Sequence, residues 1–344
     1  MLSHGATLLD ERRNDDLAEL ARIRSLESVE VIDLRQRQSD WLADLTPAPS
    51  DELLTEPSRW VYFPWRRTLV GLLGPRAFRT LRLDRNRDKI TSDEQQRFEN
   101  LKIGVVGLSV GHSIAHTLAM EGLCGELRLA DFDDIELTNL NRIPGSVLDL
   151  GVNKAIVAAR RIAEIDPYLK LAVFPSGFNA EMSASFFDGL DVVVEECDSF
   201  EAKINVRIEA KARGIPVIME TDDRGMIDVE RYDLEPTRPL FHGLLGAIDP
   251  TEVAGLPRDE AMPYFARLAE LDKVSARMVA SIDEIGRTLS SWPQLGSEIQ
   301  LAGATVAAAV RRIGLGEPLR SGRVRIDLTE MLDQLDEPLI KAIG

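Results

Sequence analysis

The pattern of hydrophobic and polar positions changes near residue 100. Residues 1–98 are rich in charge, and their apolar positions recur mostly at the spacing of helices. Beyond them, short runs of apolar and β-branched residues alternate with amphipathic stretches. The runs that predict β-strands lie at residues 102–106, 126–130, 170–174, 191–195 and 215–219.

The composition of these predicted strands indicates how they are arranged. Strands that are apolar at almost every position are buried on both faces, as in a parallel sheet covered by helices on both sides. Amphipathic helices are predicted between the strands, for example in residues 153–165, where apolar residues line one face. We therefore expect an α/β fold that is Rossmann-like and doubly wound, with a mainly parallel sheet and helices on both faces.

The remaining segments predict two additions to this core. Residues 1–98 are expected to form a mostly helical N-terminal extension, in which the prolines of "EPSRWVYFPWRR" (residues 56–67) break any helix. The Rossmann-like core is expected to span residues 99–240. Residues 241–344 are expected to form a C-terminal helical segment that closes with a strand at residues 322–328.

Composition narrows the class of protein. The 344 residues are 44% hydrophobic, enough for a sizeable core, and the formal net charge is −16. A chain this acidic lacks the basic face that a nucleic-acid backbone requires, so we expect neither DNA nor RNA as a main partner. No apolar run approaches the roughly 18 residues of a membrane span, and we expect no membrane partner.

Cysteine usage points to the redox compartment. Cys124 and Cys197 are the only cysteines. Two cysteines cannot form a disulfide framework or a four-cysteine zinc site, so we expect no zinc and a cytoplasmic location. The first residues also turn charged too early for a secretory signal.

The segment "KIGVVGLSVGHSIA" (residues 102–115) has the pattern of a strand, a glycine turn and the start of a helix. Gly107 and Gly111 are four positions apart with Ser109 between them, which departs from the G-x-G-x-x-G dinucleotide fingerprint. Asp131 ends the next predicted strand, where an acid can accept hydrogen bonds from ribose hydroxyls. Each feature alone also fits an ordinary turn or a solvated acid, but together they predict a nucleotide site.

Further charges follow at the same edge of the predicted sheet. Arg142 and Lys154 supply two cations that suit the charge on a transferring phosphoryl group. Asn139 can orient phosphates or the loop itself, and this whole segment also fits a surface loop. Asp198 follows a buried strand, so it can bind Mg²⁺ beside phosphates. Alternatively, Asp198 or Ser199 can cap the next helix, and the two roles can coexist.

These motifs resemble the ThiF/MoeB/HesA superfamily, the adenylyltransferases related to ubiquitin-activating enzymes. The segment "DFDDIELTNLNR", which holds Asp131, Asp133 and Arg142, matches the D-x-D and N-L-x-R motifs of the family. Lys154 in "GVNK" matches the lysine that follows them, and Asp198 matches the metal-binding aspartate. The N-L-N-R motif is much more specific than the glycine turn.

The resemblance covers roughly residues 85–328 and implies a reaction in which a carboxylate attacks the α-phosphate of ATP. An acyl adenylate forms and pyrophosphate leaves. The usual carboxylate is the C-terminus of a small ubiquitin-like or sulfur-carrier protein, and ATP and Mg²⁺ are the implied cofactors. The implied nucleotide-binding residues are Gly107, Ser109, Gly111, Asp131, Asp133 and Asn139, and the implied catalytic residues are Arg142, Lys154, Arg87 and Asp198, with Asp198 as the metal ligand.

Arg87 lies in "DRNRDKITSDEQQRF", which echoes the R-Y-x-R-Q segment of the family. The resemblance implies a homodimer in which this arginine reaches the triphosphate of the neighbouring subunit. The alternative is a surface arginine that pairs with Asp84 or Asp88.

Two other functions remain open at this point. An NAD-dependent oxidoreductase would share the nucleotide site, but it would leave Arg142, Lys154 and Asp198 without a role. A non-catalytic scaffold that retains the fold would explain the altered glycine turn, but it would not explain why Arg87, Arg142, Lys154 and Asp198 occur together.

Overall fold

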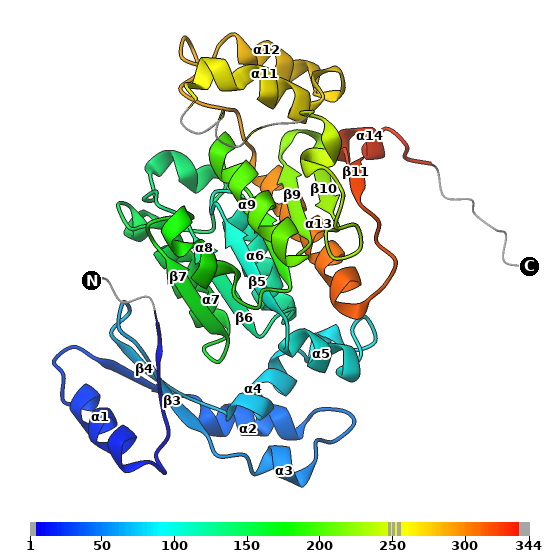
Figure 1. The fold of residues 1–344 in the computed structure, drawn as a ribbon. Helices are drawn as coiled ribbons and strands as arrows, with labels where there is room; N and C mark the ends of the chain where they lie inside the picture. The colour runs from blue at the N-terminus through cyan, green and yellow to red at the C-terminus, as the bar shows by residue number, and fades with distance from the viewer. Residues whose placement is uncertain (1–4, 247–248, 250–251, 253–255, 337–344) are drawn as a thin grey trace, which may run out of the picture.

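The computed structural model describes residues 5–246, 249, 252 and 256–336. Within them a seven-stranded sheet forms the centre of the molecule (Figure 1). Its strands in spatial order are β11 (Gly322–Arg325), β10 (Met226–Glu230), β9 (Val217–Thr221), β8 (Val192–Glu195), β5 (Lys102–Val106), β6 (Glu126–Ala130) and β7 (Lys170–Phe174). The strands from β9 to β7 are parallel, and β10 and β11 are added antiparallel at one edge. The expected α/β fold with a mainly parallel sheet is confirmed.

Helices cover both faces of this sheet. One face carries α6 (Gly111–Glu121), α7 (Lys154–Ile165) and α13 (Gly296–Leu315), and the other carries α8 (Ala180–Phe187) and α9 (Phe200–Arg213) (Figure 1). Alternate residues of β8 pack into the apolar cores on the two faces of the sheet. Val192 and Val194 pack on the α6 side and Val193 packs on the α9 side, which explains why this strand is apolar at successive positions.

The N-terminal segment differs from the expected, mostly helical extension, because its helices surround a four-stranded mixed sheet with the order β1-β3-β4-β2. The prolines of residues 56–67 do interrupt the helical pattern, but they flank a strand in which Trp60, Val61 and Phe63 are buried. The strands are β1 (Thr7–Leu9), β2 (Glu30–Asp33), β3 (Arg59–Phe63) and β4 (Thr68–Leu72), and the helices are α1 (Asn14–Arg24), α2 (Arg35–Ala43), α3 (Asp51–Leu54), α4 (Pro75–Arg82) and α5 (Ser92–Glu99).

This N-terminal unit is attached to the core near the amino ends of β6 and β7. The side chains of Trp65 and Arg66 both donate to the carboxylate of Glu164, close to the C-terminal end of α7. The hydroxyl of Tyr168 donates to the carbonyl of Leu73 at 2.6 Å. The carboxyl edge of the parallel strands, where ligands bind in such sheets, therefore faces away from the N-terminal unit.

The C-terminal segment is helical and returns to the sheet as β11, so the expected closing strand is present. In Figure 1, two of its helices lie above the carboxyl ends of the strands. Its helices before and after α13 are α11 (Arg258–Ala269), α12 (Ala276–Ile282) and α14 (Leu328–Leu332). Among the residues that the structure describes, no helix combines the length and apolar character needed to cross a membrane.

Candidate active site

The glycine turn between β5 and α6 is required by close backbone packing. Gly107 has a φ of +86°, and a Cβ atom there would lie 2.3 Å from the carbonyl oxygen of Glu196. A Cβ atom on Gly111 would lie 2.7 Å from a methyl carbon of Val105. The two glycines thus let α6 begin directly above β5 and beside the end of β8. This geometry fits the alternative of an ordinary tight turn, and it also brings the helix N-terminus to the carboxyl edge.

Asp131 holds this turn from the end of β6. Its Oδ2 accepts a hydrogen bond from the N–H of Leu108 at 2.6 Å, and its Oδ1 accepts one from the N–H of Asp133 at 2.8 Å. Asp131 is 8% exposed, so the alternative of a solvated acid is wrong. Burial raises the pKa of its carboxyl group, and the two backbone donors oppose that rise.

Lys154 and Asp133 form an ion pair at the same edge. Lys154 is the first residue of α7, its side chain is buried, and its Nζ lies 2.8 Å from Oδ2 of Asp133. Asn153 caps α7 and also donates to the backbone carbonyls of Asp131 and Asp133. The segment after β6 is therefore tied back to the strand at Asp131 and Asp133, while many of its residues are exposed, as in a surface loop.

Arg142 connects the N-L-N-R segment with the glycine turn. Its Nε donates to Oγ of Ser109 at 3.2 Å, and its guanidinium also donates to the carbonyl of Thr138. Burial lowers the pKa of Arg142, and the carboxylates of Asp222 and Asp198 oppose that decrease. This places its positive charge between the turn and two acids.

Asn139 has a role in the loop. Its buried side chain accepts a hydrogen bond from the N–H of Glu136 through Oδ1, and the carboxylate of Glu136 accepts from the N–H of Asn139 in return. These reciprocal bonds fix the short helical turn over Leu137–Asn141. Of the two roles that the sequence leaves open for Asn139, orientation of the loop is the one seen here.

Asp198 does not cap the helix that follows β8. The N-cap of α9 is Ser199, whose Oγ accepts from the N–H of Ala202 at 3.3 Å. Asp198 is exposed and lines a cavity. Within the described residues its carboxylate makes no hydrogen bond or ion pair, so it is available to a ligand.

The cavity lies at the carboxyl edge of the sheet and has a volume of about 540 Å³. Arg142 and Asp198 line it together with four other acids, Asp223 and a group of three that lie close to one another, Glu196, Glu220 and Asp222. Helices α11 and α12 supply an apolar wall that includes Phe265 and Met278. Asp131, Asp133 and Lys154 are not among its lining residues. Asp131 is linked to the cavity through the glycine turn, where Leu108 donates to Asp131 and Ser109 accepts from Arg142.

The three additional acids are unusual because they are buried close to one another. Glu220 is 3% exposed, and burial first, followed by the charges of Glu196 and Asp222, raises its pKa to about 10. Glu196 is 9% exposed, and its Oε1 accepts from the N–H of Glu220 at 3.0 Å. The signal that reveals them is a carboxylate directly after an apolar strand, in "VVVEEC" and "VIMETDD".

Arg87 is not part of this assembly. Its guanidinium lies 2.7 Å from Oδ1 of Asp84 and donates to the carbonyl of Thr46. The neighbouring Asn86 donates to the carbonyl of Glu121, at the C-terminal end of α6 and about 16 Å along that helix from the glycine turn. The pairing with Asp84 is the alternative that the sequence leaves open, and a role in a neighbouring subunit stays a prediction.

The two cysteines lie at opposite ends of the parallel strands. Cys124 is buried before the start of β6, and Cys197 follows the end of β8. Burial, followed by the charge of Glu195, raises the pKa of Cys197 well above its usual range, so this cysteine is held as a thiol.

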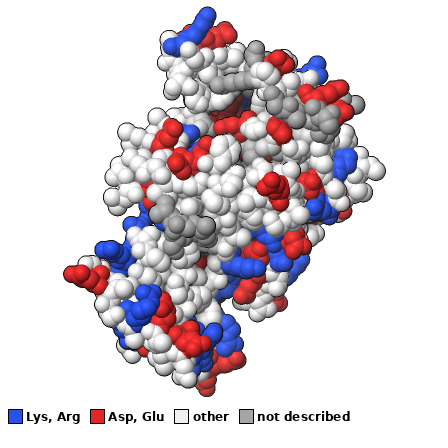
Figure 2. All heavy atoms as spheres, turned by 60° about the vertical axis from the view of Figure 1, so that its left-hand side comes forward, with Lys and Arg blue, Asp and Glu red and all other residues white. Residues whose placement is uncertain are grey.

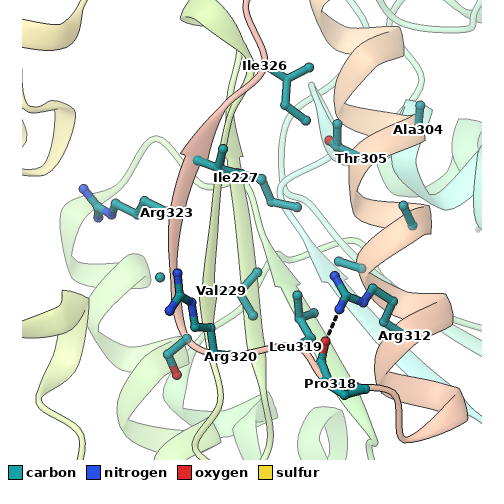
Figure 3. A pocket seen from close by; sticks show the side chains of 15 residues that line it. Ile227, Val229, Ala304, Thr305, Arg312, Pro318, Leu319, Arg320, Arg323 and Ile326 are labelled. Atoms are coloured by element: carbon teal, nitrogen blue, oxygen red, sulfur yellow. Dashed lines mark hydrogen bonds between the residues drawn. The ribbon is translucent and has the colours of Figure 1, made fainter.

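A larger hollow of about 860 Å³ lies elsewhere, between β10, β11 and α13 (Figure 3). Its lining is mainly apolar, with Ile227, Val229 and Ile326 among the residues shown. Arg312 donates to the carbonyl of Pro318, so this cation is already engaged. The hollow does not include the glycine turn or the residues around it, and we do not assign the chemistry to it.

Comparison with known proteins gives one family and several relatives. The model of the ThiF family matches residues 83–254. The uncharacterized protein MT1398 of Mycobacterium tuberculosis is 53% identical over 342 residues, which is 99% of this chain and 48% of that protein. A tRNA threonylcarbamoyladenosine dehydratase of Bacillus subtilis is 31% identical over 44% of this chain and 60% of its own length.

A sulfur carrier protein adenylyltransferase of Thermus thermophilus is 25% identical over 46% of this chain and 57% of its own length. The chain thus spans only about half to three fifths of the length of the relatives it matches. Among solved structures, PaaA matches with a TM-score of 0.52 and 20% identity, over 72% of this chain and 83% of PaaA. This structural likeness concerns the fold.

Proposed function

Because the chain belongs to the ThiF family, we propose that it is an ATP-dependent adenylyltransferase that activates a carboxylate. The carboxylate attacks the α-phosphate of ATP, an acyl adenylate forms, and pyrophosphate leaves. The observation that carries this proposal is the cavity at the carboxyl edge of the sheet, which joins Arg142 and Asp198 beside the start of α6. Ligands bind at this edge in doubly wound sheets.

The nucleotide is proposed to lie over the ends of β5 and β6. Helix α6 directs its N-terminus there, and the N–H groups of its first turn are proposed to contact the phosphates. Asp131 uses a lone pair of each oxygen for a backbone N–H, and its remaining lone pairs can accept from ribose hydroxyls. Ser109 and Asp133 flank this position and are proposed to contact the nucleotide as well.

Arg142 and Lys154 are proposed to neutralise the triphosphate as charge moves onto the departing pyrophosphate. In such a reaction the protein acts mainly by positioning and by electrostatic stabilisation. Asp198 fits a magnesium ligand, because its exposed carboxylate lines the cavity and magnesium commonly takes one or two carboxylates plus phosphate oxygens. Bound there, Mg²⁺ would add positive charge beside the phosphates.

We propose that the carboxylate substrate is the C-terminus of a small ubiquitin-like or sulfur-carrier protein. The similarity to a sulfur carrier protein adenylyltransferase of Thermus thermophilus supports this choice. The Bacillus subtilis relative is named for a tRNA substrate, but the net charge of −16 disfavours a polyanion. On the face drawn in Figure 2, basic and acidic side chains are intermixed and the basic ones form no continuous strip.

The experiment that tests the proposal is exchange of radiolabelled pyrophosphate into ATP. We expect Mg²⁺-dependent exchange that rises when a small carrier protein with a free C-terminus is added. Blocking that C-terminus as an amide should abolish the stimulation, which identifies the carboxylate as the nucleophile. Exchange that requires tRNA and ignores every carrier protein would contradict the proposed substrate.

A further inference from the structure

The cavity of the candidate active site contains more acid than its proposed chemistry requires. Its lining includes the acids Glu196, Asp198, Glu220, Asp222 and Asp223, and the bases Arg142, Lys203 and Arg325. ATP and the carboxylate to be adenylated are both anions, and they would gain nothing from additional carboxylates. The excess of acid therefore calls for a cation that the described residues do not provide.

Glu220 is the clearest case of an unused group. It is 3% exposed, and within the described part of the chain neither of its carboxylate oxygens has a hydrogen-bond partner. Oδ2 of Asp222 also has none there. Buried polar groups are nearly always hydrogen-bonded, so an unpartnered carboxylate at a cavity wall indicates a missing donor.

The bases that line the cavity are already engaged with other groups. Lys203 lies 3.1 Å from Oε1 of Glu195, behind the cavity wall. Arg142 donates to Ser109 and lies close enough to Asp222 to interact through charge. Arg325 donates to the carbonyl of Ala269 through Nη2, while its buried Nε has no hydrogen-bond partner among the described residues. The carboxylates that oppose the lowering of the pKa of Arg325 by burial are those of Glu270 and Asp223, not that of Glu220. None of these bonds satisfies the carboxylate of Glu220.

The arrangement fits an organic cation better than a metal ion. Among the described residues, no group of three or more His, Cys, Asp or Glu side chains is arranged to hold a metal. An ammonium carries three N–H donors and a guanidinium can donate two parallel hydrogen bonds to one carboxylate, and Glu220 and Asp222 provide acceptors for such donors. The lining of the same cavity also includes Met262, Phe265 and Trp292, which suits a hydrocarbon stem.

We propose that this end of the cavity binds an organic cation, an ammonium or guanidinium group on an apolar stem, through Glu220, Glu196 and Asp222. The cation belongs to a molecule that reacts at the neighbouring nucleotide, and in this respect the inference rests on the proposed function. Two sources share this chemistry, a basic carboxylate substrate and an amine that accepts the acyl group.

The test is calorimetric titration of the full chain with n-butylguanidinium chloride and with n-butylurea, which has nearly the same shape without the charge. We expect the guanidinium to bind at least about tenfold more tightly and with release of a proton, because the raised pKa of Glu220 keeps it protonated in the empty site and only a cation can take the place of that proton. Glu220→Gln should bring the two probes within about twofold of each other. Glu126→Gln, which changes a buried glutamate of β6 that pairs with Arg128 outside the cavity, should leave the preference intact.

Equal binding of the two probes by the wild type, or an unchanged preference in Glu220→Gln, would overturn the inference. Displacement of the guanidinium by MgCl₂ in the absence of ATP would assign the acids to a metal and would overturn it too. Asp222→Asn serves as the second variant if Glu220→Gln does not fold. Binding of Mg-ATP is titrated separately. A protein that binds Mg-ATP without preferring the cation would contradict only this inference, whereas a protein that does not bind Mg-ATP would contradict the proposed function.

The source of the cation is assigned by pyrophosphate exchange with L-arginine and its neutral counterpart L-citrulline. Stimulation by arginine alone would place the cation on the adenylated compound. No stimulation by either, with binding of n-butylguanidinium intact, would place it on the acceptor.

Discussion

At the scale of the residue, Arg142 and Lys154 are not equivalent cations. The Nζ of Lys154 lies 2.8 Å from the carboxylate of Asp133, so much of its charge is already compensated. The guanidinium of Arg142 donates to Ser109 and Thr138 instead, and among the described residues it forms no close ion pair. Arg142 therefore presents the less compensated charge to an incoming phosphate.

Arg142→Ala is expected to lower the rate of pyrophosphate exchange on the order of 10²-fold while the apparent ATP constant changes little. The reason is that charge concentrates on the phosphates as pyrophosphate departs, so the cation acts mainly in the transition state. Lys154→Ala should also lower exchange, but by less. Steady-state exchange kinetics of both variants provide the measurement, and near-normal rates in both would contradict the assignment.

The buried glutamate Glu220 makes stability depend on pH. Its pKa is raised to about 10, whereas a glutamate in an unfolded chain titrates near 4.5. The folded state therefore holds this proton more tightly, and the stability gained is complete at low pH and is lost as pH rises towards the folded-state pKa. The groups that face Glu220 are Glu196, Asp222 and Glu298, all acidic, and Glu196 and Asp222 also have raised pKa values.

Glu220→Gln is expected to flatten the decrease of stability between about pH 5 and about pH 9, because the amide has no proton to lose. Urea unfolding at several pH values measures the free energy of unfolding of each protein. Glu181→Gln, at an exposed site in the first turn of α8, is the matched control and should follow the wild type. Parallel curves for the wild type and Glu220→Gln would show that the buried acid does not titrate as described.

At the scale of the element, the sequence predicts the strands that are apolar throughout. The predicted runs 102–106, 126–130 and 170–174 coincide with β5, β6 and β7. Strand β10 has no such signal, because Asp228 and Glu230 interrupt its apolar run. Both are buried in ion pairs with residues far along the chain, such as Glu230 with Arg207. Only the folded structure supplies those partners, so local pattern cannot reveal the strand.

Some residues of the candidate site can be predicted from the sequence, and others cannot. Asp131 and Asp198 follow predicted strands and Arg142 lies in a specific motif, so the sequence spacing predicts that all three lie at the site. The burial of Glu220 is not readable, because it depends on helices that pack over the carboxyl edge from the C-terminal segment. The role of Asn139 in its loop likewise depends on reciprocal bonds with Glu136.

Gly107→Ala tests the junction between β5 and α6. The substitution adds strain at a φ of +86° and places Cβ 2.3 Å from the carbonyl oxygen of Glu196. Gly151→Ala is the matched control, since its φ is +73° and nothing lies within 4 Å of the added atom. We expect about 1 kcal/mol of destabilisation at Gly151 from backbone strain and at least about 2 kcal/mol at Gly107, where the clash is added.

Urea unfolding of the two variants measures these costs under identical conditions. Equal costs at the two positions would mean that the backbone of β8 moves away freely, and the close packing would then not explain the glycine.

At the scale of the whole molecule, the open question is whether the site is completed by a second copy. Arg87 lies at the far end of α6 and pairs with Asp84. We predict that it nevertheless acts in trans in a two-fold dimer, on the leaving phosphates of the neighbouring subunit. Arg87→Ala should then abolish turnover, whereas Asp84→Asn, which removes only the ion pair, should not.

A mixing experiment separates action in trans from action within one subunit. Arg87→Ala and Asp198→Ala should each be inactive as homodimers. In mixed dimers, action in trans leaves one site with both defects and the other with none, so part of the activity returns. No recovery in demonstrated mixed dimers would exclude action in trans.

The carboxyl edge of the sheet is proposed to be an adenylating site and not a dinucleotide site. The most direct measurement is the shift in melting temperature caused by Mg-ATP and by NAD, because a ligand that binds only the folded state raises that temperature. We predict stabilisation by Mg-ATP that persists in Arg142→Ala, and little or none by NAD. Stabilisation by NAD with none by Mg-ATP would contradict the proposed adenylating site.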